Sequence, residues 1–320
     1  MHPKKILYVH YQAYERDGSN THTAAFEHWF GRLCKSREID FDVLAPPLQT
    51  TAEPERDSLW SRFTHTLARF YLRDFKLLLR EWRRKGREQA LLAESRPDLV
   101  ITRFDDNTLS ILWACRALGI PAVIEVNSPT VEAINAHYRH LPLFRRIFSN
   151  QHALTLAQGA FTVSEPLTRE LQAEVPGKAV TTVPNGVDPA RFALTQDGAE
   201  VRTQFDIPPA RVVIGFVGSF APWHGIGELA QAFEALVNRG VDVHLLLVGQ
   251  TNAGSQSILA PLRKPELASR VSYAGFVPLP QIPEYLAAMD ITTLANTEDY
   301  CSPLKLFEYM AMGKPTVSVD

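Results

Sequence analysis

Short runs of β-branched and aliphatic residues recur along the chain and alternate with segments of helical period. Strands that alternate with helices predict a parallel sheet covered by helices on both faces. The run HLLLVG supports this, because it is apolar without alternation, as expected of a strand buried on both faces. We predict an α/β fold with strands at Ile6–His10, Asp40–Leu44, Leu99–Thr102, Ala122–Val126, Ala160–Val163, Val180–Val183, Val212–Val217, Val243–Val248, Val271–Tyr273, Ile291–Leu294 and Thr316–Val319.

The 320 residues divide into two such units. A single hydrophobic core rarely serves so long a chain, so two domains are expected. The polar segment PARFALTQDGAEVRTQFDIPP, Pro189–Pro209, interrupts the alternation and carries prolines near both ends, which is typical of a domain junction. We predict domains over residues 1–193 and 194–320.

Composition and charge argue against several classes of protein. The formal net charge of −2 gives no global attraction to nucleic acid. The three cysteines (Cys34, Cys115 and Cys301) are odd in number and far apart, which favours a reducing compartment. The first apolar run is too short for a signal peptide, and no later run approaches a membrane span. The sequence predicts a cytoplasmic protein.

The segment Ser58–Leu92 predicts a long basic amphipathic helix. A basic stripe keeps the spacing of an apolar stripe but lies about 200° round the helix from it. Two interpretations stay open: a core-packed helix with a solvated basic face, or a helix over 62–87 on an anionic membrane surface or a lipid phosphate, which would make the protein peripheral on the inner face of the membrane. The apolar stripe is Phe63, Leu67, Tyr71, Phe75, Leu78 and Trp82, and the basic stripe is Arg69, Arg73, Lys76, Arg80, Arg83 and Arg87.

The last stretch, SPLKLFEYMAMGKPTVSVD, predicts a helix followed by a strand. Ser302 suits the N-cap, Pro303 the first helical position, and Gly313 the position just past the end. Lys305 then lies in the first turn, where its charge opposes the helix dipole unless an anion binds the free amides. Glu308 shares the face of Lys305, so an i, i+3 ion pair is the alternative.

These stretches resemble the retaining nucleotide-sugar glycosyltransferases of family 4, which have the GT-B fold of two Rossmann-like domains facing a cleft. LKLFEYMAMGKPTV is similar to the characteristic helix of that family, and VPNGVDPARF to its turn between the domains. VGSFAPWHGIGELAQAF resembles the first strand, loop and helix of its donor domain. The resemblance implies transfer of a sugar, with retention, from a nucleotide-sugar donor to a glycan or lipid-linked acceptor, in cell-envelope or exopolysaccharide synthesis, without a metal or other cofactor.

On the donor side, the resemblance implies that Glu308 accepts hydrogen bonds from ribose hydroxyls and that Lys305 meets the phosphates. The family has an acidic residue where this chain has Tyr300, and an Arg and a Lys where it has Ser219 and His224. A histidine still donates hydrogen bonds, so His224 is a candidate for assisting the departing diphosphate. The donor side also includes Ser302, Gly249 and Val277.

The acceptor side is expected where strands of the first domain end, because parallel α/β sheets bind ligands there. The loop Gly18-Ser19-Asn20 follows the first strand and precedes a helix expected near Thr21. In IEVNSP, Asn127 stands where many family members place a histidine of the cleft. The candidates are Gly18, Ser19, Asn20 and Arg103 for the acceptor or phosphates, with Asn127 and Glu125 as catalytic or positioning residues; ordinary turns are the alternative explanation.

Several other interpretations fit less well. GIGELA, Gly225–Ala230, formally matches a dinucleotide fingerprint, but Gly218 already closes the preceding strand, and the next strand lacks the acidic residue that NAD requires. Asp105-Asp106 fits a helix start better than a metal site. Two further functions stay open: a sugar-nucleotide epimerase of related fold, and a non-catalytic nucleotide-binding protein.

By the same resemblance, the second domain is expected to be incomplete, since family members continue beyond Asp320 with further helices and strands. The strand at Thr316–Val319 would then form an exposed edge. Nucleotide binding is expected to survive this loss better than turnover does, and the chain is expected to be weakly active or inactive.

Overall fold

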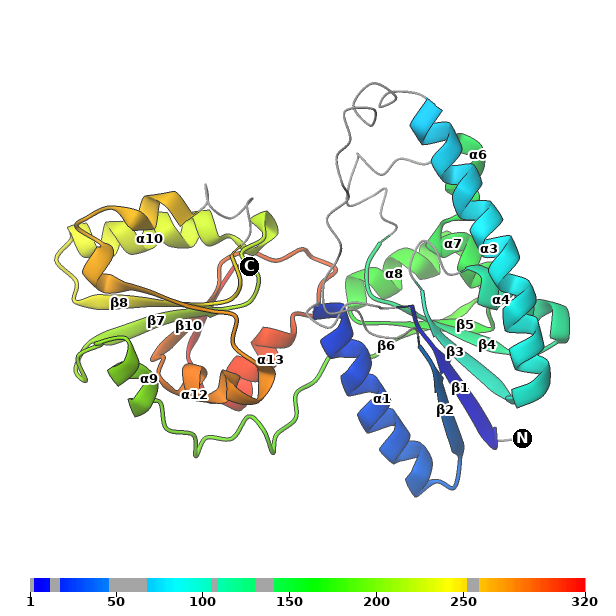
Figure 1. Ribbon diagram of the computed structural model, residues 1–320, viewed down its shortest axis with the longest axis horizontal. Helices are drawn as coiled ribbons and strands as arrows, with labels where there is room; N and C mark the ends of the chain where they lie inside the picture. The colour runs from blue at the N-terminus through cyan, green and yellow to red at the C-terminus, as the bar shows by residue number, and fades with distance from the viewer. Residues whose placement is uncertain are drawn as a thin grey trace. The chain divides into compact units, whose positions relative to one another are not determined.

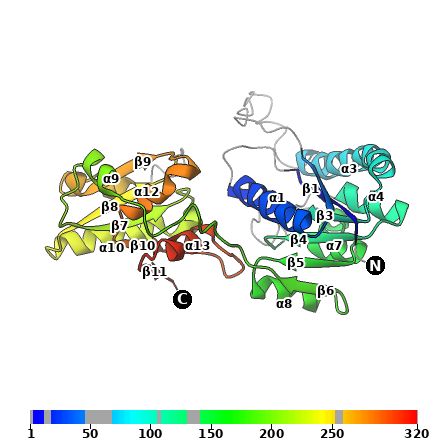
Figure 2. The same cartoon turned by 90° about the horizontal axis from the view of Figure 1, so that it is seen from below.

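The computed structural model describes residues 3–11, 18–45, 68–104, 109–129, 141–251 and 259–319. It divides the chain into two compact units, Met1–Pro184 and Asn185–Asp320. Each unit holds one parallel sheet surrounded by helices, which confirms the predicted α/β fold of two Rossmann-like domains (Figures 1 and 2). Phe63, Leu67 and Asp105-Asp106, about which predictions were made, lie outside the described residues.

The first unit is built on six parallel strands in the order β2-β1-β3-β4-β5-β6. Each predicted strand of this unit lies within one residue of the observed one. The chain moves from β1 to β2 on one side and then returns to β3 on the other, so the carboxyl ends of β1 and β3 form a switch point. The strands are β1 Lys5–Val9, β2 Asp40–Leu44, β3 Leu99–Arg103, β4 Ala122–Val126, β5 Gly159–Thr162 and β6 Ala179–Thr182.

Helices pack against this sheet and against one another. The aromatic residues Phe26 and Phe30 of α1 cover Ile6 and Tyr8 of β1, with Ile101 of β3 beside them. The longest helix, α3, packs along α4, while α7 contacts β4 and α8 contacts β5 and β6. The helices are α1 Gly18–Ser36, α3 Ala68–Ser95, α4 Leu109–Leu118, α6 Pro142–Ile147, α7 Asn150–Leu156 and α8 Glu165–Glu174.

The helix α3, which begins at Ala68, confirms the helix predicted over residues 58–92 for residues 68–92 but not the packing of its apolar stripe; residues 58–67 lie outside the described residues. Phe75 is 58% exposed and Trp82 67% exposed, whereas Asp74 and Glu81 of the same helix are fully buried. The interpretation in which the apolar stripe faces the core is therefore wrong at these positions. The reason is that Asp74 and Glu81 face inward instead, where their carboxylates accept hydrogen bonds from backbone amides at the starts of α6 and α4.

The second unit holds five parallel strands in the order β11-β10-β7-β8-β9. Neighbouring residues of β7 point to opposite faces: Val213 and Val217 enter one apolar cluster, and Ile214 and Phe216 enter another. Both faces are thus covered, as the unalternating strands predicted. The strands are β7 Val212–Val217, β8 Val243–Val248, β9 Val271–Gly275, β10 Ile291–Leu294 and β11 Thr316–Ser318.

Helices on the two faces complete this unit. The longest of them, α10, places Ile226 and Phe233 in the cluster with Phe216. On the other face, the phenol of Tyr309 in α13 accepts a hydrogen bond from the Val217 amide at 2.9 Å, which ties this helix to β7. The helices are α9 Ala199–Gln204, α10 Ile226–Asn238, α12 Ile282–Ala287 and α13 Leu304–Ala311, with short 3-10 turns η2 Pro222–His224, η3 Ala260–Arg263, η4 Ala268–Arg270 and η5 Leu279–Gln281.

The segment between the two sheets belongs to the second unit. The division falls after Pro184, a few residues before the boundary predicted at 193. Phe192 is buried in the apolar cluster of the second unit, together with Val201 of α9. The polar composition of the segment suggested a junction, but its aromatic residue anchors it to one side.

Candidate functional site

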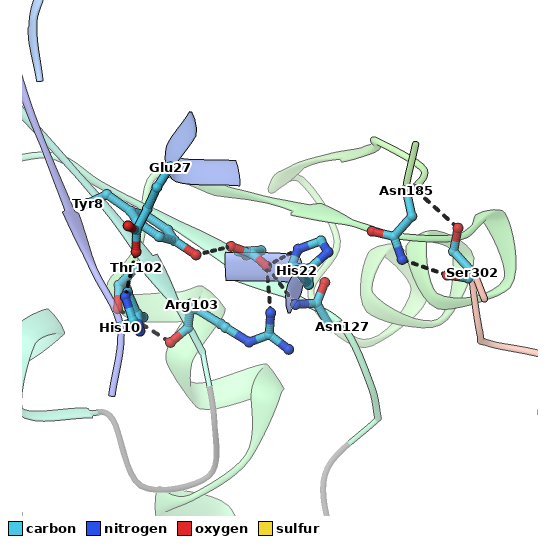
Figure 3. A network of polar contacts seen from close by, with 10 residues as sticks. Tyr8, His10, His22, Glu27, Thr102, Arg103, Asn127, Asn185 and Ser302 are labelled. Atoms are coloured by element: carbon cyan, nitrogen blue, oxygen red, sulfur yellow. Dashed lines mark hydrogen bonds and ion pairs between the residues drawn. The ribbon is translucent and has the colours of Figure 1, made fainter. Parts of the chain in front are cut away.

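A buried carboxylate organises the carboxyl end of the first sheet (Figure 3). Glu125, in β4, is fully buried. Its Oε2 accepts a hydrogen bond from the Tyr8 hydroxyl at 2.8 Å, and its Oε1 lies 2.7 Å from His22 Nε2. Asn127 Nδ2 donates to the same Oε1 at 2.6 Å, and an Arg103 guanidinium nitrogen lies 3.4 Å from it. Strands β1, β3 and β4 and helix α1 all contribute to this cluster.

The cluster holds Glu125 as an anion. Burial alone would raise the pKa of this carboxyl, but the hydrogen bond from His22 and the charge of Arg103 outweigh burial and lower the pKa to about 2. Because Glu125 is inaccessible, it suits a positioning role: it orients His22, Asn127 and Arg103. Arg103 Nε and Asn127 Oδ1 are themselves buried without a hydrogen-bond partner in the described chain.

Sequence reasoning found only part of this cluster. Asn127, Glu125 and Arg103 were predicted, but Tyr8 and His22 were missed. Their signal was weak: Tyr8 is a residue of the first strand, and His22 lies just after the Gly18 loop. A second pair, His10 Nε2 and Glu27 Oε1 at 2.7 Å, appears in the same view (Figure 3).

The predicted loop Gly18-Ser19-Asn20 is helical. The helix α1 begins at Gly18 and not near Thr21, so the three residues form its first turn. The first turn of a helix exposes unpaired amides, so the stretch keeps the capacity to bind an anion through its backbone. The side chains of these three residues lie outside the described part of the structure.

In the second unit, the Lys305 ammonium is buried without a hydrogen-bond partner in the described part of the chain. Its Nζ is inaccessible and has no hydrogen-bond partner in the described residues, so the ion pair with Glu308, which was the alternative interpretation, is not formed. It lies 4.5 Å from the centre of the Phe216 ring. Burial lowers the pKa of Lys305 to about 8. A Cβ on Gly218 would lie 2.7 Å from Nζ, so glycine there makes room for the ammonium.

Glu308 lies one turn further along α13 and is also perturbed. Burial raises the pKa of its carboxyl to about 7, although the charges of Lys305 and Arg191 oppose that rise. Both residues therefore carry charges that the folded chain only partly compensates. A ligand with an anionic group for Lys305 and hydroxyl donors for Glu308 would compensate both.

The loop that follows β7 brings His224 close to Lys305. His224 Nδ1 lies 2.6 Å from the Ser219 carbonyl oxygen, so this nitrogen carries the hydrogen and donates it. Burial and the Lys305 charge lower the pKa of His224. Nε2 of the neutral ring is then an acceptor, and His224 binds a phosphate through Nε2 only when protonated. Ser219 Oγ lies 3.4 Å from the same Nδ1.

Ser302 does not cap α13, contrary to the prediction. Pro303 occupies the N-cap position, without a side-chain cap hydrogen bond. The Ser302 hydroxyl instead accepts a hydrogen bond from the Asn185 amide at 3.1 Å, and its carbonyl accepts one from Asn185 Nδ2 at 2.5 Å (Figure 3). Asn185 was predicted only as a turn residue, yet it fixes the approach to α13. Gly313 has φ +59° just past the helix, as predicted.

The remaining donor-side candidates have structural roles in the fold. Gly249 closes β8 with φ +156°, and a Cβ there would lie 1.9 Å from the Gly218 carbonyl oxygen, so it lets the two strand ends meet. The Val277 side chain is buried in the core, which leaves only its backbone for a ligand. Tyr300 is half-buried, and burial, with Cys301 beside it, raises its pKa to about 12. Among the described residues, no group of three or more His, Cys, Asp or Glu is placed to hold a metal.

Comparison with known proteins decides the family. The profile of Glycosyltransferase Family 4 matches residues 18–191, more than half of the chain. The chain belongs to glycosyltransferase family 4. The profile of Glycosyl transferases group 1 matches residues 211–320, so the two halves of this family member match two glycosyltransferase profiles.

Relatives of this family 4 chain include a characterised enzyme and several solved structures. It is 28% identical over 239 residues to 2-deoxystreptamine glucosyltransferase of Streptomyces kanamyceticus, and the match covers 69% of this chain and 59% of that protein. HepE of Anabaena in complex with UDP shares the fold, with a TM-score of 0.65 at 16% identity over 98% of this chain and 80% of that one. Sucrose-phosphate synthase of Thermosynechococcus elongatus has a TM-score of 0.68 at 16% identity, with the same coverage.

Proposed function

We propose that this family 4 protein binds a nucleotide-sugar through the second unit and transfers the sugar, with retention, to a glycan or lipid-linked acceptor. The observation that carries the proposal is the Lys305 ammonium at the first turn of α13, which is buried without a hydrogen-bond partner among the described residues. A lone buried cation is costly unless an anion reaches it, and a diphosphate also suits the free amides of that turn.

The proposed chemistry is stabilisation of the departing nucleoside diphosphate. When the bond from sugar to phosphate breaks, negative charge grows on the phosphate oxygens, and Lys305 is placed to meet it. His224 would add a second positive charge, because the negative charge of a bound diphosphate raises the pKa of the imidazole and so favours its protonated form. Glu308 would hold the ribose hydroxyls. No metal or cofactor is needed in this scheme, and no protein nucleophile is assigned.

The first unit is proposed to hold the acceptor. The buried Glu125 anion would hold the side chains of His22, Asn127 and Arg103 in fixed orientations. These side chains would then offer hydrogen bonds to sugar hydroxyls or phosphate. Support for the acceptor class comes from relatives. A solved structure of similar fold, at 18% identity and a TM-score of 0.60, is the lipopolysaccharide outer core galactosyltransferase WaaB. A role in cell-envelope or exopolysaccharide synthesis follows that analogy.

Ligand-dependent thermal stabilisation tests the donor site directly. The chain is melted with UDP, GDP, ADP, CMP or NAD, beside the variants Glu308→Ala and Glu228→Ala. A ligand at a hundredfold excess over its Kd stabilises by about 2.7 kcal/mol, so one nucleoside diphosphate should raise the Tm. Glu308→Ala should lose that shift. Glu228→Ala, at an exposed carboxylate of the same unit, should keep it.

Turnover is then followed with the sugar form of the nucleotide that binds. Anomeric configuration of the product, read by NMR, tests retention. Release of a modified sugar without any acceptor would instead favour an epimerase. A melt that moves with NAD alone, or with none of the nucleotides, would overturn the proposed donor site.

A further inference from the structure

Three of the four acidic residues of α3 are turned into the protein at seven-residue spacing. Asp74 and Glu81 are fully buried, and Glu88 is 4% exposed. Asp74 Oδ2 accepts a hydrogen bond from the Leu141 amide at 2.7 Å, and Glu81 Oε2 accepts one from the Ser110 amide at 3.0 Å. These amides belong to the starts of α6 and α4, where a carboxylate also meets the positive end of the helix dipole.

The burial of these carboxylates leaves the outer surface of α3 basic. The helix carries eight basic and four acidic residues, in a chain whose net charge is −2. Between residues 73 and 95, where the side chains of α3 are described, Glu94 near the C-terminal end is the one exposed carboxylate. Lys76, Arg80, Arg83 and Arg87 are exposed along this length. Such a surface favours an anionic partner.

An apolar hollow lies along the same helix. It has a volume of about 380 Å³ and is lined by Phe75, Leu78, Leu79, Trp82 and Lys85 of α3 and Trp113 of α4. Phe75 and Trp82 are mostly exposed, although an apolar side chain of that size is stabilised by leaving water. Large exposed aromatic residues beside basic ones are typical of helices that lie in a membrane interface.

We propose that α3 docks the protein on an anionic phospholipid surface, with Phe75, Trp82 and Trp113 entering the interface and Lys76 and Arg83 reaching lipid phosphates. Trp suits the boundary between headgroups and acyl chains, because one end of its ring system is polar. The 28 residues of α3 span about 42 Å, which is long enough to offer several lipids at once. None of the described helices is long and apolar enough to cross a membrane, so the contact is with the surface.

Vesicle flotation of the full chain tests this surface without any sugar transfer, so its failure would leave the proposed function untouched. Vesicles of phosphatidylcholine with about one-third phosphatidylglycerol should carry the protein, and pure phosphatidylcholine should carry at least tenfold less. Each basic residue near an anionic surface contributes about 1 kcal/mol, or about fivefold in binding. Lys76→Glu with Arg83→Glu should therefore abolish flotation at physiological salt, and high salt should weaken the wild type.

The aromatic part is tested by Phe75→Ala with Trp82→Ala, which should weaken binding at least tenfold. Trp29→Ala is the matched control, because Trp29 is an exposed aromatic residue of α1, 43% exposed, in the same unit. Lys35→Glu with Arg37→Glu, at exposed positions at and just beyond the end of α1, controls for charge. Wild-type protein that stays at the bottom of the gradient would overturn the proposal. So would aromatic variants that float like the wild type, or a dimer in solution that Trp82→Ala dissociates.

Discussion

Replacing Lys305 by Met should make the empty protein more stable and at the same time destroy its nucleotide site. Met fills a similar volume beside Phe216 but carries no charge. The Nζ atom has no hydrogen-bond partner in the described chain, so the substitution removes only its cation–π contact with Phe216 and its attraction to Glu308. A buried charge that lowers stability but binds a ligand should give this result: its removal raises the free energy of unfolding and weakens ligand binding.

The magnitude follows from the pKa of Lys305. Its fall from 10.5 to about 8 corresponds to about 3 kcal/mol, an upper limit because the stem of the side chain is partly exposed. Between pH 8 and 10.5 the unfolded chain binds more protons at this residue than the folded chain does. Wild-type stability should therefore gain this contribution as pH rises through that window, and Lys305→Met should have it already at pH 7.

Urea denaturation at pH 7 and 10, with and without nucleoside diphosphate, measures both effects. Lys305→Met should raise the free energy of unfolding by about 1–3 kcal/mol without ligand and lose at least tenfold in affinity, since hydrogen bonds to charged groups contribute about 1.5–3 kcal/mol. Lys264→Met, in an exposed pair with Glu234, should change little. A destabilised Lys305→Met protein that still binds nucleotide would refute the anion site.

Three further substitutions test Gly218 and Glu308 beside Lys305, and Glu125 in the first unit. Gly218→Ala should lower the free energy of unfolding by about 1–3 kcal/mol in urea denaturation and weaken nucleotide binding. The new Cβ would lie 2.7 Å from Lys305 Nζ, and the backbone φ of +146° strains any residue other than glycine. The control Gly227→Ala in α10 adds a Cβ with nothing within 4 Å and should not destabilise the protein. Glu308→Gln should stabilise the empty protein at pH 8: the pKa of this carboxyl is raised from 4.5 to about 7, so wild-type stability falls as pH rises through that window. Glu125→Gln should lower the free energy of unfolding by about 3–5 kcal/mol at pH 7, because it leaves the buried Arg103 charge unpaired. In the wild type, the stability that the Glu125 anion contributes is present above pH 4.5 and should be lost as the pH falls through 2. A variant as stable as the wild type at pH 7 would contradict the buried ion pair.

The strands and the donor helix could be predicted because their causes are local. Val212–Val217 and Val243–Val248 match the observed strands residue for residue, since short, mostly apolar runs that begin and end with valine favour a strand buried on both faces. Gly313 marks the end of α13 because a left-handed residue favours glycine. The choice of Lys305 and Glu308 as donor candidates rested on their helical spacing and on family resemblance.

Other features depended on contacts between residues far apart in the chain. Ser302 had the chemistry of a cap, but Asn185, over a hundred residues earlier, takes its hydroxyl as an acceptor. His22 and Tyr8 joined the site only because β4 brings Glu125 between them. No local sequence pattern predicts such pairings, since they depend on which strands lie side by side in the sheet.

The helix α3 shows the division between the two levels most clearly. The sequence by itself determined that residues near 70–92 form a helix with an apolar stripe and a basic stripe, because both follow from helical spacing. Tertiary structure alone decided which side faces inward. The amides at the starts of α4 and α6 needed acceptors, so Asp74 and Glu81 went inside, and Phe75 and Trp82 were left on the surface.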